Sequence, residues 1–306
     1  MEALWYNPVY RETVFVVLLF IFAMGTIVFL LRKKNAQWLA AWASIKSWLF
    51  AAPMILFILG LPPGWTLVSL TVLSVLGSKT FFQLTGMYHR SYFVWLSYVG
   101  IIGLAYLIYW DLPRVYDLMP MIFLGGICFI PLLRNNYIHM IQYIGLSLIS
   151  FCFLGWAFLH LGRIALMDSG AFLLIYIVIL TEFSENVLLI ASKVIGKFKP
   201  FSRITTKRTF EAFVLSFILT LILAWGMRHL LPIRSPRFWL AAGTVACFGG
   251  VLGDLVMTVI RRDLGIKQVG AFIIGRGDFL RRMDRLIFVA PLYYYALKYL
   301  MTGHVI

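Results

Sequence analysis

Residues 12–31 read ETVFVVLLFIFAMGTIVFLL, a run in which the only charged side chain is the first. A helix needs roughly 20 apolar residues to cross the hydrocarbon core of a bilayer, so this run predicts a membrane-spanning helix. Arg11 precedes the run and a basic triplet at 32–34 follows it, without a small-residue cleavage site. We therefore expect a retained span and not a signal peptide.

Similar apolar runs recur along the whole chain. The expected spans lie near residues 12–31, 47–61, 64–84, 92–110, 117–133, 138–160, 171–192, 210–231, 238–260 and 286–301. The second ends at Leu61-Pro62-Pro63-Gly64, which predicts a tight hairpin or a partly re-entrant pair with the third. The expected fold is all-α, a polytopic integral membrane protein of about ten transmembrane helices.

The composition excludes both a soluble domain and a disordered chain. Apolar residues make up 62% of the chain and charged residues 13%, whereas a soluble domain carries about 25% charged residues. So much apolar surface cannot be left in water. Length indicates no second domain, so we expect a single membrane domain over 1–306, with N-terminal helices in 1–165 and a functional site among the helices of 166–306. His160, at the edge of an expected span, is interpreted as an interfacial polar residue.

Basic residues gather in alternate loops between the expected spans. On one side of the bilayer the loops hold 19 of the 27 Lys and Arg residues. These are Arg32, Lys33, Lys34, Lys46, Arg90, Arg134, Lys193, Lys197, Lys199, Arg203, Lys207, Arg208, Arg261, Arg262, Lys267, Arg276, Arg281, Arg282 and Arg285. By the positive-inside rule we expect this side, with any active site, to be cytoplasmic in the plasma (inner) membrane, and both termini to face away from it. The net charge of +15 favours anionic lipid headgroups or a phosphorylated substrate over nucleic acid.

Several acidic residues lie at membrane depth, where a carboxylate is costly unless it meets a cavity, a partner or a cation. Glu182 and Glu185 are three residues apart and share one helical face. Asp254 follows a glycine-rich segment near the end of the ninth span, and Asp284 closes the loop before the tenth. Carboxylates beside Lys and Arg suit a magnesium-bound nucleotide. The alternative is that each acid only pairs with an arginine to stabilise the bundle.

Residues 249–291 read GGVLGDLVMTVIRRDLGIKQVGAFIIGRGDFLRRMDRLIFVAP. This stretch resembles the signature of the phosphatidate cytidylyltransferase family, the CDP-diacylglycerol synthases: Gly-Asp, Ser-x-x-Lys-Arg, Lys-Asp, Pro-Gly-His-Gly-Gly and Asp-Arg-x-Asp. The matching residues are Gly253, Asp254, Thr258 for Ser, Arg261, Arg262, Lys267, Gly270, Gly277, Arg282 and Asp284. Upstream, residues 204–213 read ITTKRTFEAF and are similar to the family's Ile-Ser-Pro-Lys-Lys-Thr-Trp-Glu-Gly-Phe. Glu185 falls where the family usually has Asp.

The resemblance implies CTP-dependent cytidylyltransfer to phosphatidate or a related lipid phosphate, which gives a CDP-activated lipid and pyrophosphate. It implies Mg²⁺ as cofactor, with Asp254 as metal ligand, and Asp254, Asp284 and Lys267 as catalytic residues. The expected substrate-binding residues are Lys207, Thr209, Glu211, Glu185, Arg261, Arg262, Arg276, Arg281 and Arg282. The expected partners are CTP, the lipid phosphate, membrane lipids and a second copy of the chain in a homodimer, with no nucleic acid.

The departures from the family pattern keep other functions open. Gln268 stands for Asp, Arg276 for His, and Arg281 for the first Asp of Asp-Arg-x-Asp. The last exchange alters local charge by two units, which would weaken or displace a bound Mg²⁺, although an arginine can also neutralise phosphate. Two alternatives follow: a catalytically impaired member that binds lipid or nucleotide or serves as a scaffold, and a transporter of an anionic solute.

Overall fold

The computed structural model describes residues 4–33, 36–135, 137–205, 208–265 and 276–302, and every regular element within them is a helix. The α-helices are α1 Pro8–Leu31, α2 Ala36–Gly60, α3 Pro63–Leu84, α4 Ser91–Tyr109, α5 Pro113–Arg134, α6 Met140–Ile149, α7 Phe158–Ala165, α8 Gly170–Val194, α9 Phe210–Gly226, α10 Pro236–Asp263 and α11 Arg276–Thr302. Three short 3-10 helices are η1 Leu4–Tyr6, η2 Met87–His89 and η4 Arg228–Leu230. A π-helix, η3 Ser150–Ala157, joins α6 to α7.

The all-α membrane fold is confirmed. Among the described residues, seven helical runs are long and apolar enough to cross a membrane, with α6, η3 and α7 forming one run, Met140–Ala165. Shorter apolar helices occur at Trp48–Gly60 and Phe210–Gly226. Each expected span coincides with a helical run, while the number of ten membrane crossings stays a prediction.

Some boundaries differ from the expected ones. The hairpin between α2 and α3 is confirmed as tight, since only Leu61 and Pro62 separate the two helices. Helix α9 ends at Gly226 and not near residue 231. Helix α11 begins at Arg276, so Asp284 lies on a helix and not in a loop. The sequence prediction missed this last extension because the first turns of α11 are rich in charged residues.

Proline and polar caps mark where several helices begin. Pro8, Pro63, Pro113 and Pro236 each open a helix, where the missing N–H group costs nothing and the fixed φ suits the first turn. At α1, the N–H of Val9 donates to Oδ1 of Asn7 at 2.9 Å. These residues set the helix starts locally, before any packing between helices.

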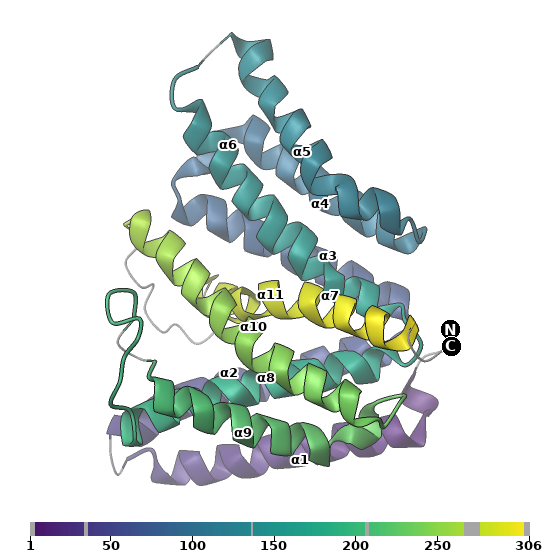
Figure 1. The fold of residues 1–306 in the computed structure, drawn as a ribbon, viewed down its shortest axis with the longest axis vertical. Helices are drawn as coiled ribbons and strands as arrows, with labels where there is room; N and C mark the ends of the chain where they lie inside the picture. Colours follow the sequence, from purple (N-terminus) through teal and green to yellow (C-terminus); the bar gives the residue numbers. More distant parts are fainter. Residues whose placement is uncertain (1–3, 34–35, 136, 206–207, 266–275, 303–306) are drawn as a thin grey trace.

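The helices run back and forth between two ends of the molecule (Figure 1). At one end, on the left of Figure 1, α8 and α10 finish and α9 and α11 begin. We call this the basic end, because Arg203 in the connection between α8 and α9 and Arg261 and Arg262 in the last turn of α10 lie there. Helix α10 packs against α8, α9 and α11, and α11 also contacts α3 and α7. The last helices thus form one half of the bundle, with α11 as its link to the other half.

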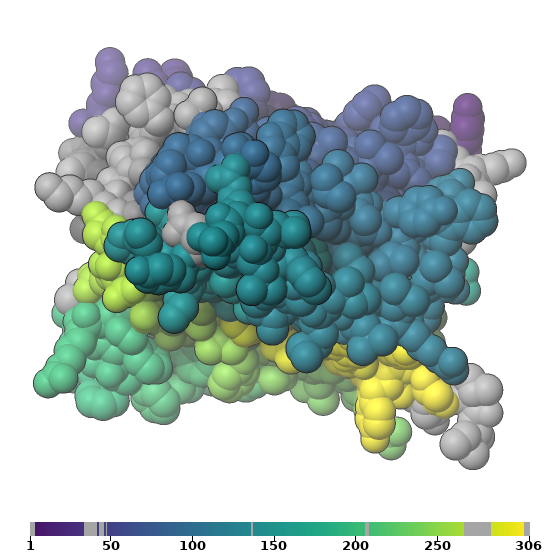
Figure 2. Space-filling model, turned by 90° about the horizontal axis from the view of Figure 1, so that it is seen from above, coloured from purple at the N-terminus to yellow at the C-terminus, as the bar shows by residue number. Residues whose placement is uncertain are grey.

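Figure 2 shows that the segments from α3 to α6, in blue to teal, cover one face of the molecule. Large apolar side chains stay exposed along these helices, including Trp95 (65%), Tyr106 (60%) and Met121 (69%). An aqueous surface rarely tolerates such a continuous apolar face. Lipid is the solvent that suits it, as expected for a membrane-spanning bundle.

Candidate functional site

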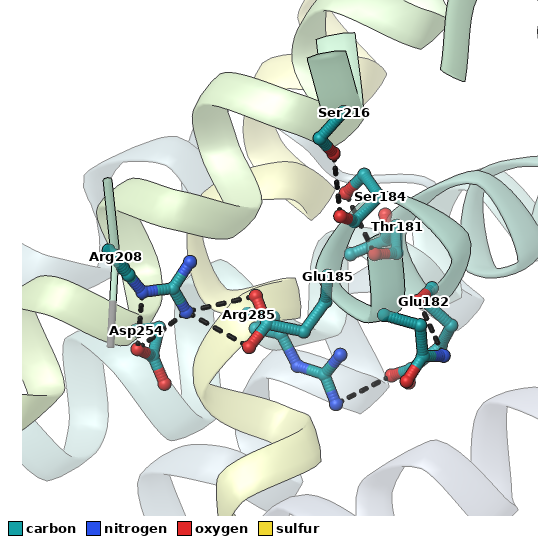
Figure 3. Close-up of polar contacts among 9 residues, drawn as sticks. Thr181, Glu182, Ser184, Glu185, Arg208, Ser216, Asp254 and Arg285 are labelled. Atoms are coloured by element: carbon teal, nitrogen blue, oxygen red, sulfur yellow. Dashed lines mark hydrogen bonds and ion pairs between the residues drawn. The ribbon is translucent and has the colours of Figure 1, made fainter. Parts of the chain in front are cut away.

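Charged side chains converge inside the bundle near the basic end. Four helices or helix starts supply them: α8, the start of α9, α10 and α11. We call the set the acid–arginine cluster; its members are Glu182, Glu185, Arg208, Asp254, Arg261, Asp284 and Arg285. The spacing of the two glutamates on α8 predicted one shared face, and both do point into this cluster (Figure 3).

Arg208 joins two carboxylates from different helices. Its Nη2 donates to both oxygens of Glu185, at 3.0 and 2.9 Å, and to Oδ2 of Asp254 at 2.7 Å. Its Nε donates to the same Asp254 oxygen at 3.2 Å (Figure 3). Arg208 is only 5% exposed and Glu185 only 8%. Charge-assisted bonds of this kind are among the strongest in proteins, and burial strengthens the attraction further.

Two more ion pairs surround this bridge. Nη2 of Arg285 lies 2.9 Å from Oε1 of Glu182, and Arg261 contacts Oδ2 of Asp284. Asp284 is fully buried, and among the described residues its Oδ1 has no hydrogen-bond partner. Among the side chains that the structure describes, four carboxylates thus meet three guanidinium groups in this cluster.

Close helix packing places these side chains. A Cβ atom at Gly253 would overlap the carbonyl oxygen of Asp284, so only glycine lets α10 approach α11 this closely. On the other side, Oγ of Ser216 on α9 donates to the carbonyl of Ser184 on α8 at 2.6 Å (Figure 3). Thr181 and Ser184 return their own hydroxyls to carbonyls of α8, which leaves the Glu185 face of that helix to the charged groups.

Three predicted substrate-binding residues, Glu211, Thr209 and Arg262, have contacts at the connection between α8 and α9. Glu211 accepts the backbone N–H groups of Lys197 and Phe198, at 3.2 and 3.1 Å. Thr209 is 2% exposed, and its hydroxyl lies 3.5 Å from that of Ser192. Nη1 of Arg262 donates to the carbonyl of Arg203 at 2.9 Å, which ties the same connection to the end of α10.

The structure brings together Glu185, Asp254, Asp284 and Arg261 from the predicted site. Lys207 and Lys267 lie outside the described residues. Arg276, Arg281 and Arg282 lie on the first turns of α11, of which only the backbone is described. The roles assigned to these residues stay predictions.

The substrate-binding, catalytic and metal residues selected from the sequence did not include Arg208 or Arg285, and Glu182 was considered only as an acid at membrane depth. Arg208 and Arg285 each stand next to a residue that was selected, Lys207 and Asp284 respectively. The sequence signal that could have identified Arg208 is the basic pair Lys207-Arg208 directly before α9, which could supply a counter-charge to Glu185 on α8 and Asp254 on α10.

The donor set can be tested against Mg²⁺. Carboxylate oxygens are the ligands that Mg²⁺ prefers, and one or two of them suffice when substrate phosphates and water complete the octahedron. Within the described part of the chain, no three Asp, Glu, His or Cys side chains form a ready metal cage. Asp254 and the unpartnered oxygen of Asp284 fit such a minimal site in chemical type, provided that Arg208 releases Asp254.

Comparison with known proteins identifies a family whose sequence pattern includes the segments that form this site. The sequence pattern of the cytidylyltransferase family matches residues 42–300. A Bacillus subtilis phosphatidate cytidylyltransferase is 25% identical over 236 residues, 72% of this chain and 86% of that protein. One from Staphylococcus aureus strain COL is 26% identical over 148 residues, 47% of this chain and 56% of its own.

A protein of Escherichia coli K12 described as uncharacterized protein YnbB is 31% identical over 133 residues, 44% of this chain and 45% of that protein. The chain therefore spans about half the length of the E. coli and S. aureus relatives that it matches. The predicted family resemblance is confirmed by the match over most of the chain.

Proposed function

Because this chain belongs to the cytidylyltransferase family, we propose that it transfers the cytidylyl group of CTP to a lipid phosphate in the membrane. Phosphatidate or a related phospholipid precursor is the acceptor. The product is a CDP-activated lipid, and pyrophosphate is released. The names of the B. subtilis and S. aureus relatives support this class of reaction.

In the proposed reaction, an oxygen of the lipid phosphate attacks the α-phosphorus of CTP in line. A new P–O bond forms as the bond to the β-phosphate breaks, and pyrophosphate leaves with the electron pair. Such a transfer needs little covalent chemistry from the protein, so catalysis comes from positioning and from neutralising phosphate charge. Basic residues before α9, before α11 and on the first turns of α11 would neutralise that charge: Lys207, Lys267, Arg276, Arg281 and Arg282.

The carboxylates of the cluster would hold the metal. We assign Asp254 as the main Mg²⁺ ligand, with Asp284 and Glu185 in support. Bound there, Mg²⁺ would supply positive charge that neutralises phosphate oxygens and orients the triphosphate. The chain's own groups then fix the acids: Gly253 sets the approach of α10 to α11, and Arg261 holds one oxygen of Asp284.

The single observation that carries the proposal is the buried contact of Asp254 and Glu185 through Arg208 at the basic end. Acids this deep in a membrane bundle are costly. Here they lie beside the connection between α8 and α9, which carries Lys197, Lys199 and Arg203. A lipid phosphate can reach such a place from the membrane while CTP comes from the water.

Pyrophosphate release from purified protein in lipid, with CTP and phosphatidate added, tests the proposal. Asp254→Asn keeps the shape of the side chain but removes its charge, and we expect turnover to fall by about a hundredfold or more. The matched control is Asp263→Asn, on an exposed residue at the end of the same helix. Turnover that persists in Asp254→Asn would refute the assignment.

We further propose that the basic end faces the cytoplasm, in the plasma (inner) membrane. The start of α1 and the end of α11 both lie at the opposite end of the molecule in Figure 1, which supports termini on the far side. Labelling of a cysteine introduced at Ser202, in the basic connection, tests this. A membrane-impermeant maleimide should label it in opened membranes and not in intact cells.

A second function, binding of lipid or nucleotide without turnover, is favoured by Arg281 in place of the family's aspartate. The two functions differ in one measurement. A binding protein would retain CTP or phosphatidate in an equilibrium binding assay while releasing no pyrophosphate with any lipid phosphate. Sustained turnover by the unmodified chain would exclude it.

A further inference from the structure

The guanidinium of Arg208 lies between the carboxylates of Glu185 and Asp254. One nitrogen, Nη2, contacts three carboxylate oxygens within 3.0 Å. Two carboxylates brought this close repel each other unless a positive charge lies between them. The guanidinium supplies that charge from within the chain.

Two buried atoms of the cluster lack hydrogen-bond partners among the described residues: Nη1 of Arg208 and Oδ1 of Asp284. Their residues are 5% and 0% exposed, so the unmade bonds are costly. A guanidinium nitrogen seeks an oxygen acceptor, such as a phosphate oxygen, and a carboxylate oxygen seeks a donor or a cation. Both atoms therefore have bonding capacity for a ligand that carries phosphate and metal together.

We propose that Arg208 is a resident counter-cation that competes with a divalent metal ion for Asp254. In this exchange the metal takes Asp254, and Arg208 keeps Glu185 and turns its freed nitrogens to a phosphate oxygen. The inference rests on the proposed function, since it assumes a metal-bound phosphate substrate. It makes Arg208 a positioning residue that keeps the acids together until substrate and metal arrive.

Arg285 supplies a matched comparison within the same cluster. It is as buried as Arg208, at 5% exposed, and pairs with Glu182 at 2.9 Å, whereas among the described residues no hydrogen bond or ion pair joins it to Asp254 or Glu185. Removing either arginine removes one positive charge from the cluster. Only removal of Arg208 takes away the group that occupies the carboxylate of Asp254.

The experiment measures Mn²⁺ binding to the full chain in lipid nanodiscs by electron paramagnetic resonance, without nucleotide. We expect Arg208→Met to bind Mn²⁺ about tenfold more tightly than the unmodified chain, and Arg285→Met to change the affinity by less than about threefold. Arg208→Lys keeps the charge but loses the planar guanidinium, so its Mn²⁺ affinity should lie between that of the unmodified chain and that of Arg208→Met. If Arg208→Met does not fold, the Mn²⁺ affinity of Arg208→Lys still tests the inference.

Added guanidinium ion provides an independent check. In Arg208→Ala, millimolar guanidinium should weaken Mn²⁺ binding toward that of the unmodified chain, while tetramethylammonium, which cannot donate hydrogen bonds, should not. Equal tightening in Arg208→Met and Arg285→Met would overturn the inference, because it would show only a general effect of charge. So would unchanged affinity in both Arg208→Met and Arg208→Lys.

Turnover is not part of this readout, so the two proposals fail separately. A chain that releases no pyrophosphate but shows the exchange at Arg208 contradicts the proposed function alone. A chain that turns over CTP but whose Mn²⁺ affinity does not change when Arg208 is replaced contradicts only the inference that Arg208 is a counter-cation.

Discussion

Both ends of the bundle bury an arginine between helices that are distant in sequence, yet the two ends are built differently. At the end opposite the basic one, Arg163 lies 2.8 Å from Oδ1 of Asp117, and its guanidinium covers the rings of Tyr116 and Tyr294, at 4.9 and 4.1 Å. Tyr295 donates to the same Asp117 oxygen at 3.0 Å. We call these five residues the aromatic clamp.

In the aromatic clamp the positive charge of Arg163 is balanced by the negative charge of Asp117. The faces of the guanidinium make cation–π contacts with the rings of Tyr116 and Tyr294. His160 beside it has an unpartnered Nε2 among the described residues, but its Nδ1 lies 2.9 Å from the carbonyl of Trp156. That contact requires the proton on Nδ1 and leaves Nε2 as an uncharged acceptor, which costs less to bury. Within the described part of the chain, the acid–arginine cluster instead has one carboxylate more than it has guanidinium groups, and Nη1 of Arg208 and Oδ1 of Asp284 have no hydrogen-bond partner. The difference separates a structural clamp from a candidate site.

The largest expected effect contrasts an aspartate from each end. Asp284→Asn removes a buried carboxylate from the acid–arginine cluster, and we expect CTP-dependent pyrophosphate release to fall by about a hundredfold. Asp117→Asn makes the same chemical change in the aromatic clamp and should alter turnover by less than about threefold. A similar loss in both variants would remove the functional distinction between the two ends.

A smaller effect, on stability, should appear at the aromatic clamp. Arg163→Ala removes a buried ion pair and two cation–π contacts, and should lower the free energy of unfolding by about 2–3 kcal/mol, the part-exposed Asp117 being able to regain water. Arg228→Ala is the control: Arg228 covers one ring, Trp225, at 4.3 Å near the surface, so its loss should cost less than about 1 kcal/mol. Unfolding in detergent micelles measures both. If the two variants lose equal stability, the clamp is no more than a surface contact.

The smallest effect tests how tightly the basic end is packed. Gly253→Ala forces a Cβ atom against the carbonyl of Asp284 and should cost about 1–3 kcal/mol, through displacement of α11. Gly125→Ala, on α5, meets no described atom within 4 Å and should stabilise its helix by roughly 0.5–1 kcal/mol. The same unfolding assay compares them. Stabilisation by both would show that α10 and α11 do not need this glycine.

The sequence predicted the helices well because each one is written in consecutive residues. The apolar run at 171–192 and the Pro62-Pro63 pair at the junction of α2 and α3 can be recognised from the local sequence, without knowledge of which helices pack against them. The sequence prediction was wrong where the burial of a side chain depends on other helices. His160, expected at the membrane interface, is fully buried among aromatic rings. No property of the neighbouring sequence reveals that α5 and α11 would cover it.

The candidate site divides in the same way. Family motifs selected Asp254, Asp284 and Arg261, and the isolated acids of α8 pointed to Glu185. They could not show that Arg208 bridges Glu185 to Asp254, since the three residues lie on different elements and up to 69 positions apart.

By itself, then, the sequence determined a membrane-embedded helical bundle, the distribution of its charge and its family, because hydropathy and motifs are local properties of the chain. Only the tertiary structure decided which arginine meets which carboxylate. That choice depends on the depth and rotation of each helix against its neighbours, as when the missing side chain of Gly253 lets α10 settle against Asp284. Pairing of buried charges is a property of that packing, and no single helix contains it.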